Sequence, residues 1–484
     1  MTLSRRRFLH AAGAAGATIA LGGCLGEGAG TARRTYAPAE PVRLAVIGLH
    51  GRGNDLLKFF RAVPLAKIVA LCDIDPAVLS GRINEAKALG EAPLALNDPR
   101  RVFDRDDIDA VVIATPNHLH AVLASWAMQA GKDVYLEKPV CHDVDEGNRL
   151  LAVAARTGRI IQAGTQNRSD VGLREAMAAL HAGEFGAISG IRGFCYRDRR
   201  GIGRAPAPIA PPPGLDYQAW LGPAADEPIL RTQFHYDWHW VWNTGNGDIG
   251  NQGPHELDLA CWALRDPGAP ELALGLGGRF AWGDAGETAN MMAAWYRFPG
   301  GIPLAFEVRN LAPKDKDAGA YHGLNEPAIV VSCAGGELRA HRGGAQFCDA
   351  KGAVVRSFKG DGGAQHQANF ITAVRQRDAT LLHAPLAHAV SSAGLAHLAN
   401  ASLRLGDAGD AAAAAAAARE HAPLGEHLDR LLGVLKDYHV DFAATPLRVG
   451  PLLTVERASG MCGGAEATAA NAILHRIPRA GWEV

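Results

Sequence analysis

Short apolar runs alternate with helical patterns over the first third of the chain. Four runs are rich in β-branched and apolar residues and read as strands: 42–47, 67–72, 110–114 and 133–136. Helical patterns separate them, as at 77–89 and 120–130. This alternation predicts a parallel sheet with helices on both faces. Because such crossovers are right-handed, we predict a doubly wound Rossmann sheet over residues 36–165.

The pattern changes after Gly164. Helical stretches become fewer, and longer apolar or alternating runs appear, such as 289–298 and 302–308. We predict a second α/β domain over residues 166–404 with a large, mostly antiparallel sheet. Residues 405–484 are predicted to be a C-terminal extension that completes the fold. Within it, the alanine run 411–418 indicates an exposed helix or a linker.

The N-terminus has the pattern of an export signal. Arg5, Arg6 and Arg7 precede an apolar run over residues 11–23, which is shorter than the ~20 residues that a membrane-spanning helix needs. Paired arginines at this place indicate the twin-arginine route. The sequence Leu21-Gly22-Gly23-Cys24 is typical of a lipoprotein processing site, although Cys24 can also be incidental to a plain cleaved signal. We therefore predict a signal and linker over residues 1–35, a periplasmic location, and membrane contact only through a lipid on Cys24.

Composition excludes several classes of protein. The residues are 48% hydrophobic and 20% charged, which is typical of globular proteins. A chain of 484 residues is too long for one ordinary hydrophobic core. The net charge is −1 and no long basic stripe occurs, which argues against a nucleic-acid partner. The eight cysteines form no CxxC pair, so a zinc ribbon or disulfide framework is not predicted. His235 and His239 could bind zinc only on a helix, and the residues that follow do not look helical, so no metal site is predicted.

A glycine turn joins the first predicted strand to the first helix. Gly48-Leu49-His50-Gly51-Arg52-Gly53 lies where a dinucleotide fingerprint belongs, and the following helix would direct its N-terminus at the pyrophosphate. The usual GxGxxG spacing requires glycine at position 50. His50 stands there, and Gly51 is the candidate for the close backbone approach. A simple strand-to-helix turn is the alternative.

Asp73 closes the second predicted strand, 25 residues after Gly48 (73 − 48 = 25). An acidic residue near this spacing accepts hydrogen bonds from a ribose diol and repels a 2′-phosphate. The nearest following arginine is Arg82. We therefore predict NAD as the cofactor in preference to NADP, with a helix-capping carboxylate as the alternative role of Asp73.

Several motifs further along resemble the Gfo/Idh/MocA family of oxidoreductases. They occur in order along nearly the whole chain after the signal: Thr115-Pro116-Asn117-His118, Glu137-Lys138-Pro139, Gly164-Thr165-Gln166-Asn167-Arg168-Ser169, Trp238-His239-Trp240 with Gly247 through Asp258, His366 through Phe370, and Ala470 through Arg479. The segment from Trp238 to Asp258 resembles a twin-arginine-exported branch of that family. The resemblance implies an open-faced second sheet and a homo-oligomer.

The resemblance also implies hydride transfer between a nicotinamide and a carbinol of a sugar or cyclitol. Lys138 matches the family's catalytic lysine and His255 its catalytic histidine, the alternatives being an ion-paired lysine and a core histidine. Asn251 stands where many members have an aspartate that orients the histidine, and it supplies no charge. Asp248, Asp258 or Glu256 could compensate.

Other positions are assigned to cofactor or substrate. The residues expected to join the glycine turn in holding NAD are Thr115, Pro116, Asn117, His120, Glu137, Lys138 and Gln166. Arg168, Tyr236, Trp238, His239 and His255 are expected to contact a carbohydrate-like substrate, because flat rings beside hydrogen-bonding groups suit a sugar. Core packing is the alternative for the tryptophans.

Export places a constraint on the reaction. A periplasm without free nicotinamide would favour cofactor loaded before export, kept bound, and used in a redox-neutral cycle. Two alternatives stay open. One is a catalytically impaired carbohydrate-binding protein, which Asn251 and His50 favour. The other is a glycosidase that works through transient NAD-dependent oxidation.

Overall fold

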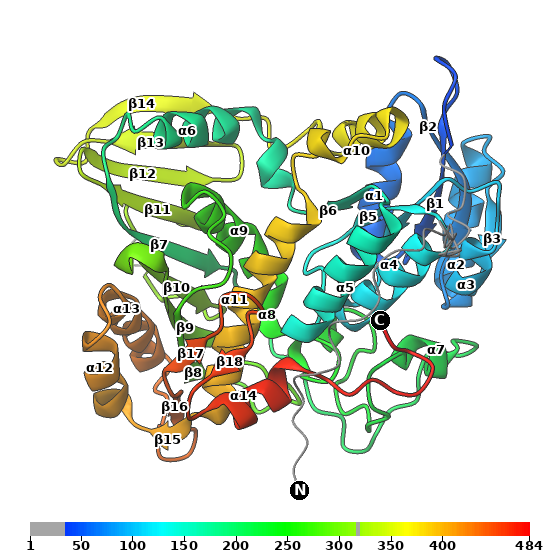
Figure 1. Cartoon of the computed structure of the whole chain (residues 1–484). Helices are drawn as coiled ribbons and strands as arrows, with labels where there is room; N and C mark the ends of the chain where they lie inside the picture. The colour runs from blue at the N-terminus through cyan, green and yellow to red at the C-terminus, as the bar shows by residue number, and fades with distance from the viewer. Residues whose placement is uncertain (1–33, 316–319) are drawn as a thin grey trace, which may run out of the picture. The chain divides into compact units, whose positions relative to one another are not determined.

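A six-stranded parallel sheet forms the N-terminal part of the computed structural model, which describes residues 34–315 and 320–484 (Figure 1). The predicted signal and Cys24 lie outside the described residues. The strands follow the order β3-β2-β1-β4-β5-β6 and all pair in parallel: β1 (Val42–Ile47), β2 (Ala66–Cys72), β3 (Leu94–Leu96), β4 (Ala110–Ile113), β5 (Asp133–Leu136) and β6 (Ile161–Ala163). The doubly wound sheet is therefore confirmed.

Helices connect these strands: α1 (Gly51–Arg61), α2 (Pro76–Ala88), α3 (Pro99–Phe103), α4 (His120–Gln129) and α5 (Val144–Thr157). Local chemistry sets their ends. Asp75 accepts hydrogen bonds from the first amides of α2, Asp143 caps α5, and Gly158 ends α5 in the left-handed region. The caps fix the first residues of these helices, which start from loops at the carboxyl edge of the sheet, where a ligand site forms.

The Rossmann core is not built from residues 36–165 alone. Helix α10 (His366–Gln376) buries Phe370 and Val374 against β1, and the first part of α11 (Leu386–Leu405) packs beside α5 and β6. Tyr36, at the predicted start of the Rossmann domain, packs against the same core. Residues 34–484 accordingly form one compact unit.

The second sheet has twelve strands, and its main path runs β14-β13-β12-β11-β7-β10-β9-β8-β16-β15. Only β7 and β10 pair in parallel, so the prediction of a mostly antiparallel sheet is confirmed. The strands are β7 (Ile188–Tyr196), β8 (Leu272–Gly278), β9 (Met291–Arg297), β10 (Pro303–Arg309), β11 (Ala328–Cys333), β12 (Gly336–His341), β13 (Gly344–Cys348), β14 (Val354–Lys359), β15 (Asp407–Gly409), β16 (Leu447–Val449), β17 (Leu453–Val455) and β18 (Cys462–Gly463).

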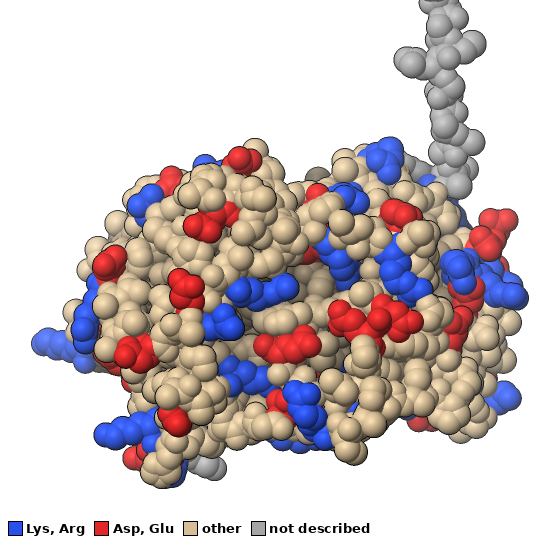
Figure 2. Space-filling view, turned by 90° about the horizontal axis from the view of Figure 1, so that it is seen from below, with Lys and Arg blue, Asp and Glu red and all other residues tan. Residues whose placement is uncertain are grey.

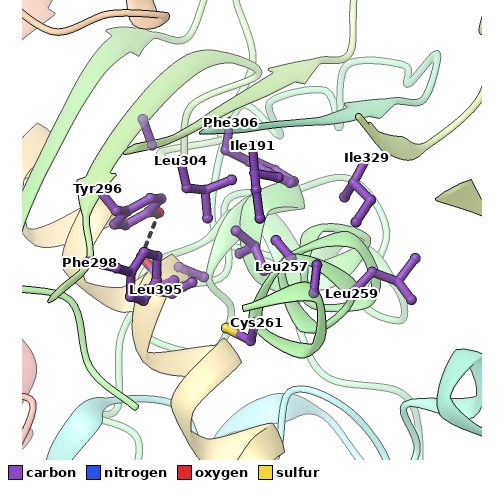
Figure 3. Packing of buried hydrophobic residues seen from close by; sticks show 14 of the residues in the cluster. Ile191, Leu257, Leu259, Cys261, Tyr296, Phe298, Leu304, Phe306, Ile329 and Leu395 are labelled. Carbon is purple, nitrogen blue, oxygen red and sulfur yellow. Dashed lines mark hydrogen bonds between the residues drawn. The ribbon is translucent and has the colours of Figure 1, made fainter. Parts of the chain in front are cut away.

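Helices cover both faces of this sheet. On one face, α6 (Val171–His181), α9 (Gly253–Ala263) and α11 form the main core, in which the Tyr296 hydroxyl donates to the carbonyl of Leu395 over 2.8 Å (Figure 3). On the other face, α12 (Ala411–Arg419) and α13 (Leu424–Asp437) pack on β8, β9 and β10. The expected open face is thus wrong over these strands, because the chain's own alanine run and the helix after it fill that position.

The charge distribution on the surface and the burial of the cysteines agree with the predictions from composition. Acidic and basic side chains are interspersed on the face drawn in Figure 2. Among the described residues seven cysteines are free, and all but Cys333 are buried, as expected of small apolar side chains. None of the described helices has the length and apolarity needed to cross a bilayer.

Candidate cofactor and active site

A cavity of about 1380 Å³, including its mouth, opens at the carboxyl edge of the parallel sheet. Three parts of the chain, together with Asn251, line it. The Rossmann loops form one side, and the long excursion 197–246, which carries α7 (Tyr217–Leu221), and the C-terminal tail form the others. Most predicted cofactor residues line this cavity: Gly48, His50, Gly51, Arg52, Asp73, Thr115, Pro116, Asn117, His120, Glu137 and Lys138.

The glycine turn is required by close packing. Gly48 has φ +83° and a side chain there would meet the carbonyl oxygen of Ala114 at 2.7 Å. A Cβ on Gly53 would lie 1.8 Å from the carbonyl oxygen of Gly48, which explains a glycine at this position although Gly53 does not line the cavity. The turn therefore brings α1 against β1 as a dinucleotide site needs.

Asp73 is held in place by two backbone amides. One carboxylate oxygen accepts from Leu49 N–H over 2.7 Å and the other from Asp75 N–H over 2.9 Å. Each oxygen has a further acceptor position. Burial raises the pKa of Asp73, against the lowering effect of these two amides. The residues present fit the adenosine ribose of NAD, because two acceptors remain for a diol on the cavity wall.

His50 fills the place of the missing glycine as an N-cap. Its Nδ1 accepts from Gly51 N–H over 3.1 Å, and its ring stacks on His235 with centroids 4.8 Å apart. His235 in turn lies 2.9 Å from the Asp75 carboxylate. The departure from the usual spacing thus ties the excursion 197–246 to the glycine turn.

Ion pairing and a buried histidine brace the loop after β5. Arg52 donates to Glu137 over 2.8 Å, and although burial disfavours a charged carboxylate, Arg52 and Lys138 keep the pKa of Glu137 below its usual range. The ring nitrogens of His120 lie 2.6 Å from the Pro139 carbonyl and 2.8 Å from the Thr115 carbonyl. His120 therefore ties together the loops that follow the neighbouring strands β4 and β5.

Lys138 joins the two halves of the site. Its Nζ donates to the Asn251 carbonyl over 2.8 Å and lies 3.4 Å from the Asn251 side-chain oxygen. Burial lowers the pKa of Lys138, Glu137 opposes this shift, and Arg52 adds to it. The amine thus loses its proton more readily than an exposed lysine, which suits a general base.

Asn251, at the end of α8 (Gly247–Asn251), does not orient His255. Its amide donates to Asp248 over 3.1 Å, while its oxygens face Lys138. Asp248 is neutralised by Arg199 at 2.9 Å and also accepts from Asn310. Asn251 therefore contacts Lys138, and not His255 as the sequence predicted.

His255 lies one helical turn after Asn251, near the start of α9, and is not among the residues that line the cavity. Its Nδ1 is buried without a hydrogen-bond partner. Burial, and then the positive charge of Lys138, hold the pKa of His255 well below its usual range. Neither Asp248 nor Asp258 compensates, since each is paired with an arginine.

Glu256 is the third residue predicted to compensate for the charge that Asn251 lacks. It is 3% exposed and accepts from Gln252 over 3.0 Å, and burial raises its pKa to about 8 against that bond. A carboxyl group with this pKa is largely protonated at neutral pH. Glu256 therefore supplies little negative charge to stabilise a charged His255.

Tyr236, Trp238 and His239 line the cavity on the excursion side. His239 stacks on Trp238 with centroids 3.6 Å apart, and its Nδ1 donates to the Tyr236 carbonyl over 2.5 Å. Burial lowers the pKa of His239 to about 3, so the ring is neutral and its Nε2 is an acceptor. An aromatic wall beside one acceptor nitrogen suits a hydroxylated ring.

Two predicted residues besides Gly53 and His255 lie outside the cavity lining. Gln166 and Arg168 do not line the cavity. Arg168 is 3% exposed and pairs with Asp258 at 2.7 Å and Asp266 at 2.5 Å. The structure gives Arg168 a role in the buried core of the second domain, contrary to the expectation of substrate contact, because two carboxylates saturate its guanidinium.

Sequence reasoning missed three tryptophans of the cavity: Trp126, Trp220 and Trp482. Trp126 lies on a predicted helix, where an aromatic residue reads as core. Trp482 lies almost at the end of the chain, and no local pattern connects it with the glycine turn. No group of three or more potential metal ligands occurs among residues 34–315 and 320–484.

Comparison with known proteins agrees with this geometry. Residues 42–165 match the family described as oxidoreductases with an NAD-binding Rossmann fold. A glycosyl hydrolase family 109 protein of Solibacter usitatus is 37% identical over 164 residues, which cover 32% of this chain and 37% of that protein. A scyllo-inositol 2-dehydrogenase (NAD(+)) of Bacillus subtilis is 35% identical over 155 residues, which cover 32% of this chain and 44% of that enzyme.

The match to solved structures extends beyond the Rossmann domain. The WlbA dehydrogenase from Bordetella pertussis, solved in complex with NADH and UDP-GlcNAcA, superposes with a TM-score of 0.54 at 20% identity. The superposition covers 74% of this chain and 94% of that one. The two-domain fold is thereby shared, whereas the sequence matches span less than half the length of the two curated relatives.

Proposed function

Because residues 42–165 belong to the oxidoreductase family with an NAD-binding Rossmann fold, we propose that the chain is an NAD-dependent oxidoreductase acting on a carbinol of a sugar, glycoside or cyclitol. One observation carries this proposal. The cavity that begins at the Gly48 turn and Asp73 also holds the Lys138 amine, whose pKa is lowered by burial. Bound NAD would supply the acceptor for the hydride that leaves the carbinol carbon.

The chain's own residues would supply the remaining chemistry. Lys138 takes the hydroxyl proton as the carbinol is oxidised and returns it when the carbonyl is reduced. Asn251 fixes the direction of that amine. Burial and the nearby Lys138 keep His255 neutral. His239 can accept a hydrogen bond from a second hydroxyl group of the substrate's ring.

The proposal includes export by the twin-arginine route and a cofactor that stays bound. The arginine triplet at residues 5–7 and the apolar run after it support export, with a lipid on Cys24 as the only membrane contact. A retained cofactor must be restored in each cycle, so one carbinol is oxidised and one carbonyl reduced before products leave. Partners are then small carbohydrate-like molecules and, at the surface of the folded protein, further copies of the chain.

Glycoside cleavage through transient oxidation is the second candidate. The names of relatives such as the Solibacter usitatus protein favour it. In that cycle a hydride leaves a ring carbinol, the new carbonyl acidifies the neighbouring C–H, and loss of that proton expels the aglycone. Water then adds to the resulting double bond and the hydride returns to the carbonyl carbon, so the net reaction is hydrolysis without consumed NAD.

The test begins with protein purified without added cofactor. Denaturation followed by mass spectrometry should release NAD at about one molecule per chain, and cyclitols, aldoses and aryl glycosides should then be supplied separately. Turnover of a cyclitol or aldose with the cofactor alternating between its two redox states supports the oxidoreductase. Release of an aryl aglycone with exchange of solvent deuterium next to the transient carbonyl supports the glycosidase. Sugar binding without turnover in wild type and in Lys138→Ala would establish the catalytically impaired binder instead.

A further inference from the structure

The last residues of the chain return to the cofactor cavity. After α14 (Ala467–Leu474) the tail passes α7 and ends beside α4 (Figure 1). Trp482 lines the cavity and its ring lies against Trp126 of α4, with centroids 5.1 Å apart and planes at 33°. Both rings are only partly buried, so each keeps surface available to a ligand.

Two arginines hold the tail before it reaches the cavity. Arg476 pairs with Glu146, and its backbone N–H donates to Asp143 over 2.9 Å. Arg479 donates to the Gln218 carbonyl over 3.3 Å and also bonds the Gln218 side chain. The tail is therefore held by Arg476 to the Rossmann domain and by Arg479 to the excursion. The position of Trp482 does not depend on its own ring contact alone.

Gly222 shows how closely the tail is fitted. It has φ +52°, and a Cβ there would lie 3.3 Å from the Trp482 ring and 2.4 Å from Leu119. The excursion thus runs close to both Leu119 and the tail, and a larger residue at position 222 would clash with Leu119 and press on the Trp482 ring. Trp482 itself lines the cavity, so the tail is part of the cavity wall.

The sheet order shows which end of the cavity the tryptophans face. Asp73 follows β2, and Pro99 and Arg100 follow β3 at the outer edge of the sheet, whereas Lys138 follows β5 on the other side of β1. Helix α4, which carries Trp126, contacts both α5 and α3, and α3 begins at Pro99. Because Trp126 and Trp482 line the same cavity as Asp98, Pro99 and Arg100, we place them at the Asp73 end, where a dinucleotide bound across the sheet would have its adenine.

We propose that the C-terminal tail is a strap over the adenosine end of the cofactor cavity, in which Trp482 and Trp126 form an aromatic wall for the adenine. This inference rests on the proposed binding of NAD. Adenine offers a flat π-face, and aromatic side chains stack on bases with useful energy. Such a strap would slow the release of NAD, because the adenine would be held against both the tail and α4.

The experiment compares Trp482→Ala, Trp482→Phe and Ile477→Ala in the full chain. Ile477 is a matched control, because it lies on the same tail, is 85% exposed and does not line this cavity. The bound NAD is removed, and the dissociation constant for added NAD is measured by calorimetry. Trp482→Ala should raise it on the order of 10- to 100-fold, the range for loss of one base-stacking aromatic. Trp482→Phe should restore most of the affinity, and Ile477→Ala should match wild type.

A second measurement separates stacking from simple destabilisation. Hydrogen exchange of wild-type residues 477–484 should slow when NAD is added, and this requires no variant to fold. Equal NAD affinity in wild type and Trp482→Ala, or unchanged exchange of the tail, would overturn the strap while leaving the proposed oxidoreductase intact. Wild-type protein that binds no NAD at all would overturn the proposed function itself.

Discussion

The two ends of the cofactor cavity differ in what surrounds them. Near Asp73 the wall has the apolar and aromatic side chains of Ile74, Leu123, Trp126 and Trp482, with the charged Asp98 and Arg100 beside them. Around Lys138 the buried polar groups are linked. Glu137 and Asn251 line the cavity, and Asp248, which does not line it, bonds to Asn251. Apolar contacts hold a ligand equally at any pH, whereas buried charges titrate. One end is thus suited to retention and the other to proton transfer.

The largest expected effect comes from substitution of Lys138, which should affect proton transfer and leave NAD retention nearly unchanged. Lys138→Ala should lower kcat by about 10²- to 10⁴-fold, because it removes the group that takes the carbinol proton. The content of bound NAD should stay within about threefold, as the adenosine end is untouched. Initial rates and the NAD released on denaturation measure both quantities.

Lys138→Arg is the matched control, since it keeps a positive charge that does not titrate. It should be about as inactive as the alanine variant. A Lys138→Ala enzyme within fivefold of wild-type turnover would remove the lysine from the chemistry.

Asp73→Ala should have the opposite profile. Loss of a charged acceptor for the ribose diol costs about 1.5–3 kcal/mol, so NAD affinity should fall about 10- to 150-fold. Because the carboxylate also repels a 2′-phosphate, the preference for NAD over NADP should shrink in the variant. Calorimetry with both nucleotides measures this, and Asp107→Ala, an exposed carboxylate on the same domain, should change neither value. An unchanged NADP to NAD ratio would contradict the assignment.

Asn251→Asp tests the charge at the Lys138 end. A general base works once it has lost its proton, so oxidation should rise with pH to a plateau below the range of an ordinary lysine, in line with the lowered pKa. A carboxylate at position 251 would favour the charged amine and move this profile by about one pH unit or more toward alkaline pH. The pH dependence of kcat decides the matter, and a profile that does not move would show that another group titrates.

Glu256→Gln should give the smallest effect, in stability alone. Burial raises the pKa of Glu256 to about 8, so its stabilising proton is fully present below the pKa of the unfolded chain, near 4.5, and is lost as pH rises through 8. Wild type should therefore lose more thermal stability than Glu256→Gln between pH 5 and pH 8. Unfolding temperatures at both values measure this, and parallel losses in the two proteins would contradict the raised pKa.

The Rossmann sheet and half of its ligand site were accessible from the sequence. The strands β1, β2, β4 and β5 were predicted because they are continuous apolar runs, while β3 and β6 were missed because three residues leave too little pattern. The glycine turn and Asp73 lie within 26 residues of one another, so spacing alone relates them. The export signal and the lipid on Cys24 stay predictions.

The other half of the site could not be read in this way. The contact of Asn251 with Lys138, the isolation of Arg168 in a buried ion pair, and the return of Trp482 all join segments separated by about 90 residues or more. Nothing local signals such pairs, and a family motif gives the residue type without its partner. Asn251 is the plainest example. The motif predicted a contact with His255, whereas the packing of α8 places Asn251 against Lys138.

Sequence by itself determined the parallel sheet, the glycine turn and the acidic residue after β2, because hydrophobic periodicity and backbone freedom act over a few residues. Tertiary structure alone decided which distant side chains close the cavity, and it covered part of the outer face of the second sheet, over β8, β9 and β10, with α12 and α13. The physical reason is that burial and charge pairing depend on what packs opposite a residue, and that is set by the whole fold rather than by the neighbouring sequence.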